Sequence, residues 1–591
     1  MSEKNKIKAL SKSASSPDAR PENPLERRRF LAYFSGAGLT ATLFPGVLWA
    51  RLQEEEASRI TAEMVRGAEQ LSGLEFTPEE REEMVRAVNQ NLEWYEGMRA
   101  KPLVNGNWPA LQFNPALPGM TFDQEKRPFL RSDPGSVRAP ANLEEAAFWP
   151  VTRLSRLVES RQVTSLELTQ MYLERLKRYD PKLECVITLT EDLALRQARR
   201  ADSEIAAGRY RGPLHGIPWG VKDLLATRDY PTTWGAEPYK DQQFDFDATI
   251  VERLEEAGAV LVAKLVSGAL ASGDTWFGGR TVTPWNTQMG TRGSSAGPGA
   301  ATAAGLVGFS IGTETRGSIV FPSTRCGLSG LRPTYGRVSR YGVMAISYSM
   351  DKAGPMCRSV EDCALVFNAI LGPDDRDPAL VDLPFNWDPD RDVTPLRVGY
   401  IASAFEEDRA SARAKSNGQA TLQTLRSLGL NLISVEFPDY PVDVQRILLY
   451  AEATAAFDEL NRSRRDTLLR RPNWSQRFRM ARTIPAVEYI QADRHRVLLM
   501  EEMNQLLSRV DMVVVPPSEP GTSSNSPLGR NTPLTNLTGH PCVVVPNGFV
   551  EDGTPSSMTF VGKLHAEEEI LAVAKRYQDA TDFHLQHPNL D

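Results

Sequence analysis

The sequence predicts an α/β fold: a large mixed β-sheet flanked by helices, with a helical arm at the N-terminus. Short apolar runs alternate along the chain with segments whose apolar residues recur at helical spacing, a pattern typical of α/β proteins. The composition, 41% hydrophobic and 24% charged, is ordinary for a soluble globular protein. At 591 residues the chain can hold several domains, or one large core with appendages.

The bulk charge and the cysteines exclude several classes of function. A net charge of −7 leaves no basic stripe for phosphate backbones, so we expect no nucleic-acid partner. The five cysteines form no C-x-x-C pair and have no histidine at ligand spacing, which argues against a disulfide scaffold and a zinc site. We expect Cys357 and Cys363 to be small buried residues, and no metal or organic cofactor.

The first 50 residues have the features of a targeting segment. Arg27-Arg28-Arg29-Phe30-Leu31 precedes an uncharged stretch that runs to Ala50, and together they resemble a twin-arginine export signal. The twin-arginine translocase would then be a partner during export. A transmembrane anchor is the alternative, because the cleavage site at Leu48-Trp49-Ala50 is poor. We expect a periplasmic or exported protein, free or anchored by an uncleaved segment.

Residues 51–142 read as an appended arm followed by a linker. Arg51 to Ala100 is amphipathic and predicts two helices, the second opened by Thr77 as cap and Pro78 in the first turn. Prolines recur between Lys101 and Asn142, which predicts an extended linker over the surface of the main domain. The expected divisions are therefore 1–50, 51–142 and 143–591.

The main domain opens with helices and continues with strands. Ser155 to Pro181 has helical spacing, and Thr164-Ser165 opens its second helix. The runs that predict strands are "CVITLT", "IPWGVKD", "AVLVAKLV", "GFSIGTE", "LRVGYIA", "MVVVPP" and "PCVVVP".

A stretch rich in glycine and hydroxyl residues, Met289 to Gly327, contains the candidate nucleophiles. Ser295 lies in a G-x-S-x-G pattern, which in a nucleophile elbow follows a strand and precedes a helix. The preceding "TPWNTQMGTRG" has no apolar run to serve as that strand. The late histidines that could complete such a triad, His540 and His565, have no distinctive setting, so we do not favour Ser295 as the nucleophile.

Three pieces read together give a different answer. "GIPWGVKDLL" around Lys222, "RGSSAG" around Ser294 and "TETRGSIVFP" around Ser318 resemble the amidase signature family. The two serines are 24 residues apart and the lysine precedes the first by 72, as in that family. The resemblance covers about Ala146 to Thr581.

The resemblance implies an amidohydrolase that cleaves a carboxamide C–N bond through a serine acyl-enzyme. Ser318 would be the nucleophile, Ser294 the proton relay after a cis peptide bond, and Lys222 the base. Lysine accepts a proton only when neutral, which requires burial to depress its pKa. A lone lysine here would more often be paired with Asp223, but the two serines in register favour the catalytic role. The implied oxyanion hole consists of the backbone N–H groups of Thr315, Arg316, Gly317 and Ser318.

The chain departs from the family at several positions. Arg316-Gly317 stands where Gly-Gly or Asp-Gly is usual, and Val320 where many members have arginine. Arg316 either presents a cation to the substrate or points outward with only its backbone in use. Ser295 is a second candidate contact to substrate. Pro298 falls in the first turn of the following helix, where proline is tolerated.

Two other functions remain open. One is a glutaminase-type amidotransferase subunit that depends on partner subunits, and the other is a catalytically silent binding protein on the same fold. We expect a small-molecule amide as substrate and a homodimer as a candidate assembly. Variable loops at Asp241–Phe246 and Asn461–Pro485, with the N-terminal linker, are the expected walls of its pocket.

Overall fold

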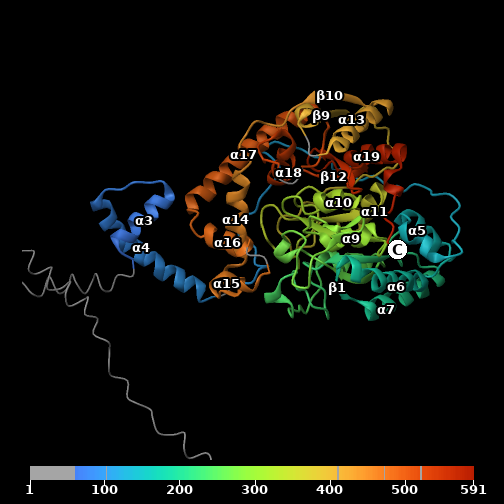
Figure 1. Ribbon diagram of the computed structural model, residues 1–591, viewed down its shortest axis with the longest axis horizontal. Coiled ribbons are helices and arrows are strands. Elements are labelled where there is room, and N and C mark those ends of the chain that lie inside the picture. Colours follow the sequence, from blue (N-terminus) through green and yellow to red (C-terminus); the bar gives the residue numbers. More distant parts are fainter. Residues whose placement is uncertain (1–59, 102, 409–410, 471–472, 519–521, 591) are drawn as a thin grey trace, which may run out of the picture. The chain divides into compact units, whose positions relative to one another are not determined.

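A computed structural model describes residues 60–101, 103–408, 411–470, 473–518 and 522–590 (Figure 1). The expected export signal, Arg27 to Ala50, lies outside these residues. The chain divides into two compact units, Met1–Lys101 and Pro102–Asp591. By its contacts the linker after Lys101 therefore belongs with the second unit, not with the helical arm.

The first unit contains the two predicted helices, α3 (Ala62–Ser72) and α4 (Pro78–Arg99). Thr77 caps α4 in a capping box with Glu80, and Pro78 occupies the first turn, as its residue types predict. Arg81 of α4 forms an ion pair of 2.7 Å with Glu69 of α3, which joins the two helices.

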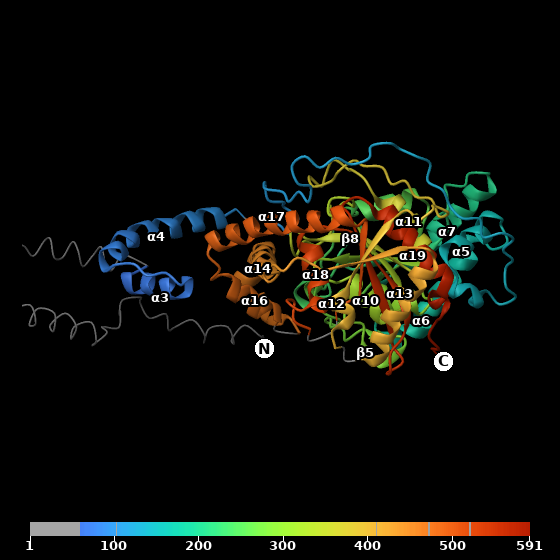
Figure 2. The ribbon, with the colours of Figure 1, turned by 90° about the horizontal axis from the view of Figure 1, so that it is seen from above.

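The second unit is built around an 11-stranded mixed sheet in the order β1-β3-β2-β6-β8-β7-β12-β13-β11-β9-β10. Figures 1 and 2 show this sheet among helices, and the arrangement confirms the predicted fold class. All seven predicted strands are present. The sheet consists of β1 (Val186–Leu189), β2 (Pro218–Lys222), β3 (Val260–Leu265), β6 (Phe309–Glu314), β7 (Ser329–Arg332), β8 (Lys352–Cys357), β9 (Arg397–Ile401), β10 (Asn431–Val435), β11 (Met512–Val515), β12 (Cys542–Phe549) and β13 (Pro555–Gly562).

Helices pack against both faces of this sheet and against one another. They are α5 (Val151–Glu159), α6 (Ser165–Leu183), α7 (Glu191–Ala206), α8 (Thr249–Glu256), α9 (Ala296–Ala303), α10 (Val320–Cys326), α11 (Val360–Ile370), α12 (Ala402–Glu406), α13 (Ala412–Ser427), α14 (Val444–Ala456), α15 (Asp458–Arg462), α16 (Asn473–Ala481), α17 (Ala486–Arg509), α18 (Pro527–Leu537) and α19 (Glu567–Thr581).

Strand β11 shows how the two faces are filled. Met512 and Val514 pack in a core cluster with residues of α11, α13 and α19. Val513 and Val515 pack in a second cluster with α14, α17 and α18. Because successive side chains of a strand point to opposite faces, one apolar run serves both layers. This is why the buried strands read as continuous apolar runs.

Two local expectations were wrong. The stretch before Ser294 does contain a strand, β5 (Asn286–Gly290), which pairs with β4 (Val282–Thr283) in a small hairpin. Its polar residues fit because this hairpin lies outside the main sheet, so it is not the strand of a nucleophile elbow. The expected loop at Asn461–Pro485 is largely helical, since it contains α16 and the end of α15. The linker, in contrast, has no helix or strand among its described residues before Leu143, as predicted.

The cysteine expectation is confirmed: Cys357 and Cys363 are fully buried free thiols. No helix within the described residues is both long and apolar enough to cross a membrane.

Candidate active site

Lys222 is the last residue of β2, between β3 and β6, and its side chain is fully buried. Its Nζ lies 2.9 Å from Ser294 Oγ and 2.8 Å from Thr313 Oγ1, and 3.4 Å from the Thr313 carbonyl. All three neighbours are neutral oxygens. Burial lowers the pKa of Lys222 to about 7, while the more distant carboxylates of Asp351 and Glu314 oppose this shift. The amine can therefore be neutral near physiological pH.

Lys222 does not pair with Asp223, the alternative that the sequence left open. Asp223 forms an ion pair of 3.0 Å with Lys264 of β3, and both side chains are fully buried. Thr233 donates two further hydrogen bonds to Asp223, from its N–H and its hydroxyl. Successive residues of an extended strand point in opposite directions, so Lys222 faces the serines and Asp223 faces away.

Ser294 lies two residues before the start of α9, and its preceding peptide bond, Gly293-Ser294, is cis. The side chain is buried, and its carbonyl accepts a hydrogen bond of 3.0 Å from the Gly268 N–H. The resemblance had implied both the cis bond and the position next to Lys222.

Ser295 has a different environment. Its hydroxyl is fully buried, donates to the Thr313 carbonyl at 3.1 Å and accepts from the Thr313 N–H at 3.2 Å. Its own N–H donates to the carbonyl of Ser318 at 3.2 Å. Because these bonds occupy the hydroxyl, we assign Ser295 a structural role in place of the expected contact with substrate.

Ser318 lies in the turn between β6 and α10 and is partly exposed. Glu314, at the end of β6, fixes this turn: one carboxylate oxygen accepts hydrogen bonds of 2.9 Å from the N–H groups of Ile319 and Val320. The other oxygen accepts bonds of 2.8 Å from Arg332 of β7 and Asn536 of α18. Four elements thus meet at one buried carboxylate.

Lys222 and Ser294 are joined by a hydrogen bond, whereas none joins the side chains of Ser294 and Ser318 among the described residues. Within the described residues the Ser318 hydroxyl makes no hydrogen bond, so the link from Ser294 to Ser318 is not closed in this state. The carbonyl of Ser318 is nevertheless held by Ser295, the residue next to Ser294. Hydrogen bonds of this kind are often long in enzymes without substrate and tighten when it binds.

The expected oxyanion residues form the same turn. Gly317 has φ of 100°, and a Cβ added there would come within 2.3 Å of the Phe321 ring, so the turn requires glycine. Thr315 donates from its hydroxyl to Asp351 at 2.5 Å. In the described part of the chain, the N–H groups of Arg316, Gly317 and Ser318 donate to no acceptor and remain available.

Arg316 is partly buried and makes no ion pair within the described residues. Burial lowers its pKa, and the guanidinium groups of Arg446 and Arg477 lower it further, partly offset by Tyr450 and Asp443. Arg477 of α16 lies over the Tyr450 ring at 5.5 Å, and Asp443 is already paired with Arg446 at 3.0 Å. Arg446 and Arg477 are thus the two cations that act on Arg316, which lies in the turn that carries Ser318.

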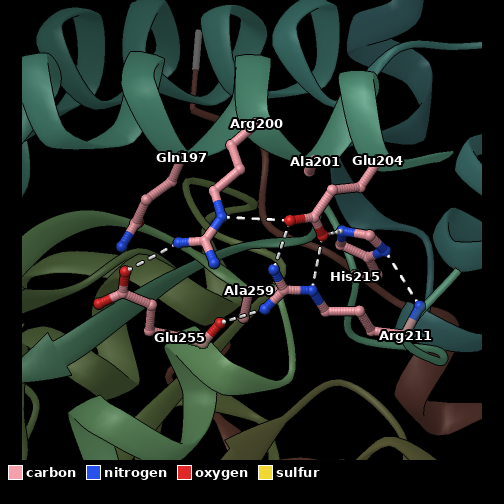
Figure 3. Close-up of a pocket in the computed structure, with 9 residues that line it drawn as sticks. Gln197, Arg200, Ala201, Glu204, Arg211, His215, Glu255 and Ala259 are labelled. Carbon is pink, nitrogen blue, oxygen red and sulfur yellow. Dashed lines mark hydrogen bonds and ion pairs between the residues drawn. The ribbon is translucent and has the colours of Figure 1, made fainter. Parts of the chain in front are cut away.

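The histidines lie outside this cluster. His215 is buried beside Glu204, 3.4 Å from Nε2 to the carboxylate, and accepts a bond of 3.1 Å from the Arg211 N–H (Figure 3). The cavity that these residues line is about 10 Å³, enough for one water molecule at most. His540 is also buried, and burial lowers its pKa to about 3. Among the described residues no histidine, His565 included, forms a hydrogen bond with Ser318.

The sequence analysis did not identify the residues that support Lys222 and the turn of Ser318 through hydrogen bonds. Thr313 bonds Lys222, Glu314 fixes the nucleophile turn, and Asp351 accepts from Thr315. Glu314 reads as an ordinary strand-end acid, and its partners Arg332 and Asn536 lie far along the chain. Only their convergence in space distinguishes them.

A family model described as Amidase matches residues 167–571. The chain belongs to the amidase family. It is 35% identical to a glutamyl-tRNA(Gln) amidotransferase subunit of Methylococcus capsulatus, over 74% of this chain and 98% of that protein. Among solved structures it resembles the peptide amidase of Stenotrophomonas maltophilia, with a TM-score of 0.66, 30% identity and coverage of 76% of this chain and 99% of that one. The corresponding amidotransferase subunit from Thermotoga maritima gives a TM-score of 0.65 at 25% identity, over 77% and 100% of the two chains.

Proposed function

We propose that this amidase-family protein hydrolyses the C–N bond of a linear carboxamide, with Ser318 as nucleophile, Ser294 as proton relay and Lys222 as base. The observation that carries the proposal is the buried amine of Lys222, with its pKa near 7, at 2.9 Å from Ser294 Oγ. A serine hydroxyl attacks an amide only when its proton is removed. A neutral lysine in contact with a relay hydroxyl supplies that base.

In this mechanism Ser318 Oγ bonds to the amide carbon while its proton passes to Ser294 Oγ, and the proton of Ser294 passes to Lys222 Nζ. The reverse transfer delivers a proton to the leaving nitrogen as the C–N bond breaks, which releases ammonia or an amine. Water then attacks the acyl-enzyme by the same route and frees the carboxylic acid and Ser318. The available N–H groups of Arg316, Gly317 and Ser318, together with that of Thr315, would stabilise the oxyanion of the tetrahedral intermediates in acylation and deacylation.

Arg316 is proposed to bind an anionic or carbonyl group of the substrate. Its partial burial, its proximity to Arg446 and Arg477, and the lack of an acidic partner in the described chain support an inward role. A substrate carboxylate would relieve the repulsion among these cations, since opposite charges within a few ångströms are favourable in a poorly solvated site.

A second candidate is a subunit of an amidotransferase, which is favoured by the names of curated relatives such as that of Methylococcus capsulatus. Such a protein would release ammonia from glutamine only together with partner subunits. The peptide amidase fold match and the expected export signal favour the free hydrolase. Purified protein that shows glutaminase activity only after partner subunits are added would establish the second candidate.

The decisive test is covalent labelling with a fluorophosphonate, followed by peptide mapping and by ammonia release from a library of amides. Labelling should occur at Ser318 and be lost in Ser318→Ala and Lys222→Ala. Ser323→Ala is the matched control, because the Ser323 hydroxyl is buried without a hydrogen-bond partner among the described residues, on the adjoining helix α10. An unlabelled wild type that binds amides without turnover would instead identify a silent binding protein.

A further inference from the structure

The linker that follows the helical arm contacts the loop behind the proposed oxyanion turn. We define the strap as residues 105–113, which lie outside the family-matched span of 167–571. We propose that the strap positions the loop 345–351, and through it Thr315 and the oxyanion N–H groups, so that Asn105 and Trp108 are positioning residues for the reaction. This inference rests on the proposed function.

The first contact is made by Asn105, whose side chain pairs with the backbone of Ala345 in both directions. Its Oδ1 accepts from the Ala345 N–H at 2.7 Å and its Nδ2 donates to the Ala345 carbonyl at 2.9 Å. The same Nδ2 lies 3.4 Å from the carbonyl of Ala456, the last residue of α14. One amide therefore joins the loop to the helix that carries Arg446 and Tyr450.

Two aromatic residues extend the contact along the loop. Trp108 meets the Tyr348 ring edge-on at 5.6 Å and lies under the Arg340 guanidinium at 4.3 Å. Arg340 in turn donates to the Tyr348 carbonyl at 2.8 Å. The Cζ atom of Arg496 lies 3.4 Å from the centre of the Phe113 ring, and the distance from Arg340 to Trp108 is measured in the same way. The Nη2 of Arg496 donates to the Ser349 carbonyl at 2.7 Å.

The opposite side of the loop faces the proposed site. Asp351 accepts hydrogen bonds of 2.8 and 2.9 Å from the N–H groups of Ile346 and Ser347, and one of 2.5 Å from the Thr315 hydroxyl. The chain of contacts thus runs from Asn105 to Ala345, through the adjoining N–H groups to Asp351, and on to Thr315, three residues before Ser318. Oxyanion donors act by being fixed before the reaction begins, so loosening their support should slow the chemical step and not substrate binding.

Asn386, which bonds another part of the linker, provides a matched control. Asn386 makes the same kind of two-way bond: it accepts from the Arg127 N–H at 2.8 Å and donates to the Glu125 carbonyl at 2.8 Å. Asn386→Ala therefore loosens the linker at a point that has no contact with the loop 345–351. Trp108→Phe is the conservative variant, because it keeps an aromatic ring between Arg340 and Tyr348.

The experiment measures inactivation of the full chain by a fluorophosphonate, with kinact and KI determined separately. For Asn105→Ala and Trp108→Ala we expect kinact to fall about tenfold while KI stays within about twofold. Trp108→Phe and Asn386→Ala should stay near the wild type, with melting temperature measured for all. Equal kinact in Trp108→Ala and Asn386→Ala, or a loss confined to KI, would overturn the proposal.

Hydrogen exchange separates this outcome from a failure of the proposed function. In Trp108→Ala the amides of Thr315 to Ser318 and of Ala345 to Asp351 should exchange faster than in Asn386→Ala, whether or not Ser318 reacts with the probe. Unchanged exchange in both segments would refute the positioning role even if the wild type is labelled normally. An unlabelled wild type with faster exchange in the variant would refute the catalytic assignment and leave the strap contact established.

Discussion

At the scale of single residues, Lys222 differs from two other buried lysines in what surrounds its amine. Lys264 forms a buried ion pair of 3.0 Å with Asp223, and Lys352, the first residue of β8, donates to the carbonyl of Met350, two residues before it. Lys222 has two hydroxyl groups and a carbonyl around it and no carboxylate in contact among the described residues. Burial without a counter-ion is what lets an amine act as a base near neutral pH.

The pH dependence of catalysis follows from this environment. A protonated Lys222 cannot accept a proton, so kcat/KM should rise through about pH 7 and level off above it, in step with the pKa of about 7. Lys352→Met is the control, because burial also lowers the pKa of Lys352 well below its usual value. The midpoint should be unchanged in this variant. A rate that is flat between about pH 5 and 9, or a midpoint that moves in Lys352→Met, would contradict Lys222 as the base.

Replacing Arg316 tests the charge preference of the pocket. Arg316→Gly should lower kcat/KM for amides that carry a carboxylate by about 10- to 100-fold, the range expected for losing one charged hydrogen bond. Neutral amides of the same size should be affected much less. Steady-state kinetics on matched acidic and neutral substrates distinguish a substrate-binding side chain from a backbone-only role. An equal loss of kcat/KM on both substrates would mean that only the backbone of Arg316 is used.

At the scale of secondary-structure elements, Glu314 joins β6, α10, β7 and α18 at the nucleophile turn. The Arg332 and Asn536 side chains and the N–H groups of Ile319 and Val320 all converge on this fully buried carboxylate. Burial would raise the pKa of Glu314, but Arg332 and these hydrogen-bond donors together hold it below its ordinary value of 4.5. The turn is therefore tied to β7 and α18 through one buried, charge-paired carboxylate.

Glu314→Gln should destabilise the protein by about 3–5 kcal/mol, because the variant leaves Arg332 buried without a counter-ion. Urea unfolding measures this loss, and Glu237→Gln is the control, since the Glu237–Lys240 ion pair is exposed and worth less than about 1 kcal/mol. Because the folded pKa of Glu314 is depressed, its stabilisation is present above pH 4.5 and is lost as the pH falls through the folded value. Glu314→Gln should therefore lose less stability than the wild type as the pH falls. Equal free energies of unfolding for Glu314→Gln and Glu237→Gln at neutral pH would contradict the role assigned to Glu314.

At the scale of the whole molecule, the amidase core is preceded by more than a hundred residues that the family model does not cover. The helical arm forms a unit of its own, whereas the linker belongs to the catalytic unit through its contacts at Asn105, Trp108 and Phe113. The segment before the arm bears the twin-arginine pattern, and we propose that it directs export of the folded protein to the periplasm or the membrane.

Changing Arg27 and Arg28 together to lysine should stop export, because the translocase recognises the arginine pair in the signal. The measurement is fractionation of a bacterial host into cytoplasm, membrane and periplasm, with the protein detected by a C-terminal tag. Arg51 and Arg59 changed to lysine form the control pair, since they lie beyond the signal and should leave localisation unchanged. Identical distribution of both variants and the wild type would contradict the export proposal.

The sequence by itself determined seven of the eleven strands of the main sheet, the helix starts at Thr77 and Thr164, and the order and spacing of Lys222, Ser294 and Ser318. Apolar periodicity, capping residues and motif spacing are local properties of the chain. The tertiary structure alone decided that Asp223 pairs with Lys264, that Ser295 bonds Thr313, and that Glu314, Asp351 and Asn105 support the site. Those contacts join residues far apart in the sequence, and burial and pKa depend on what the whole fold packs around each group.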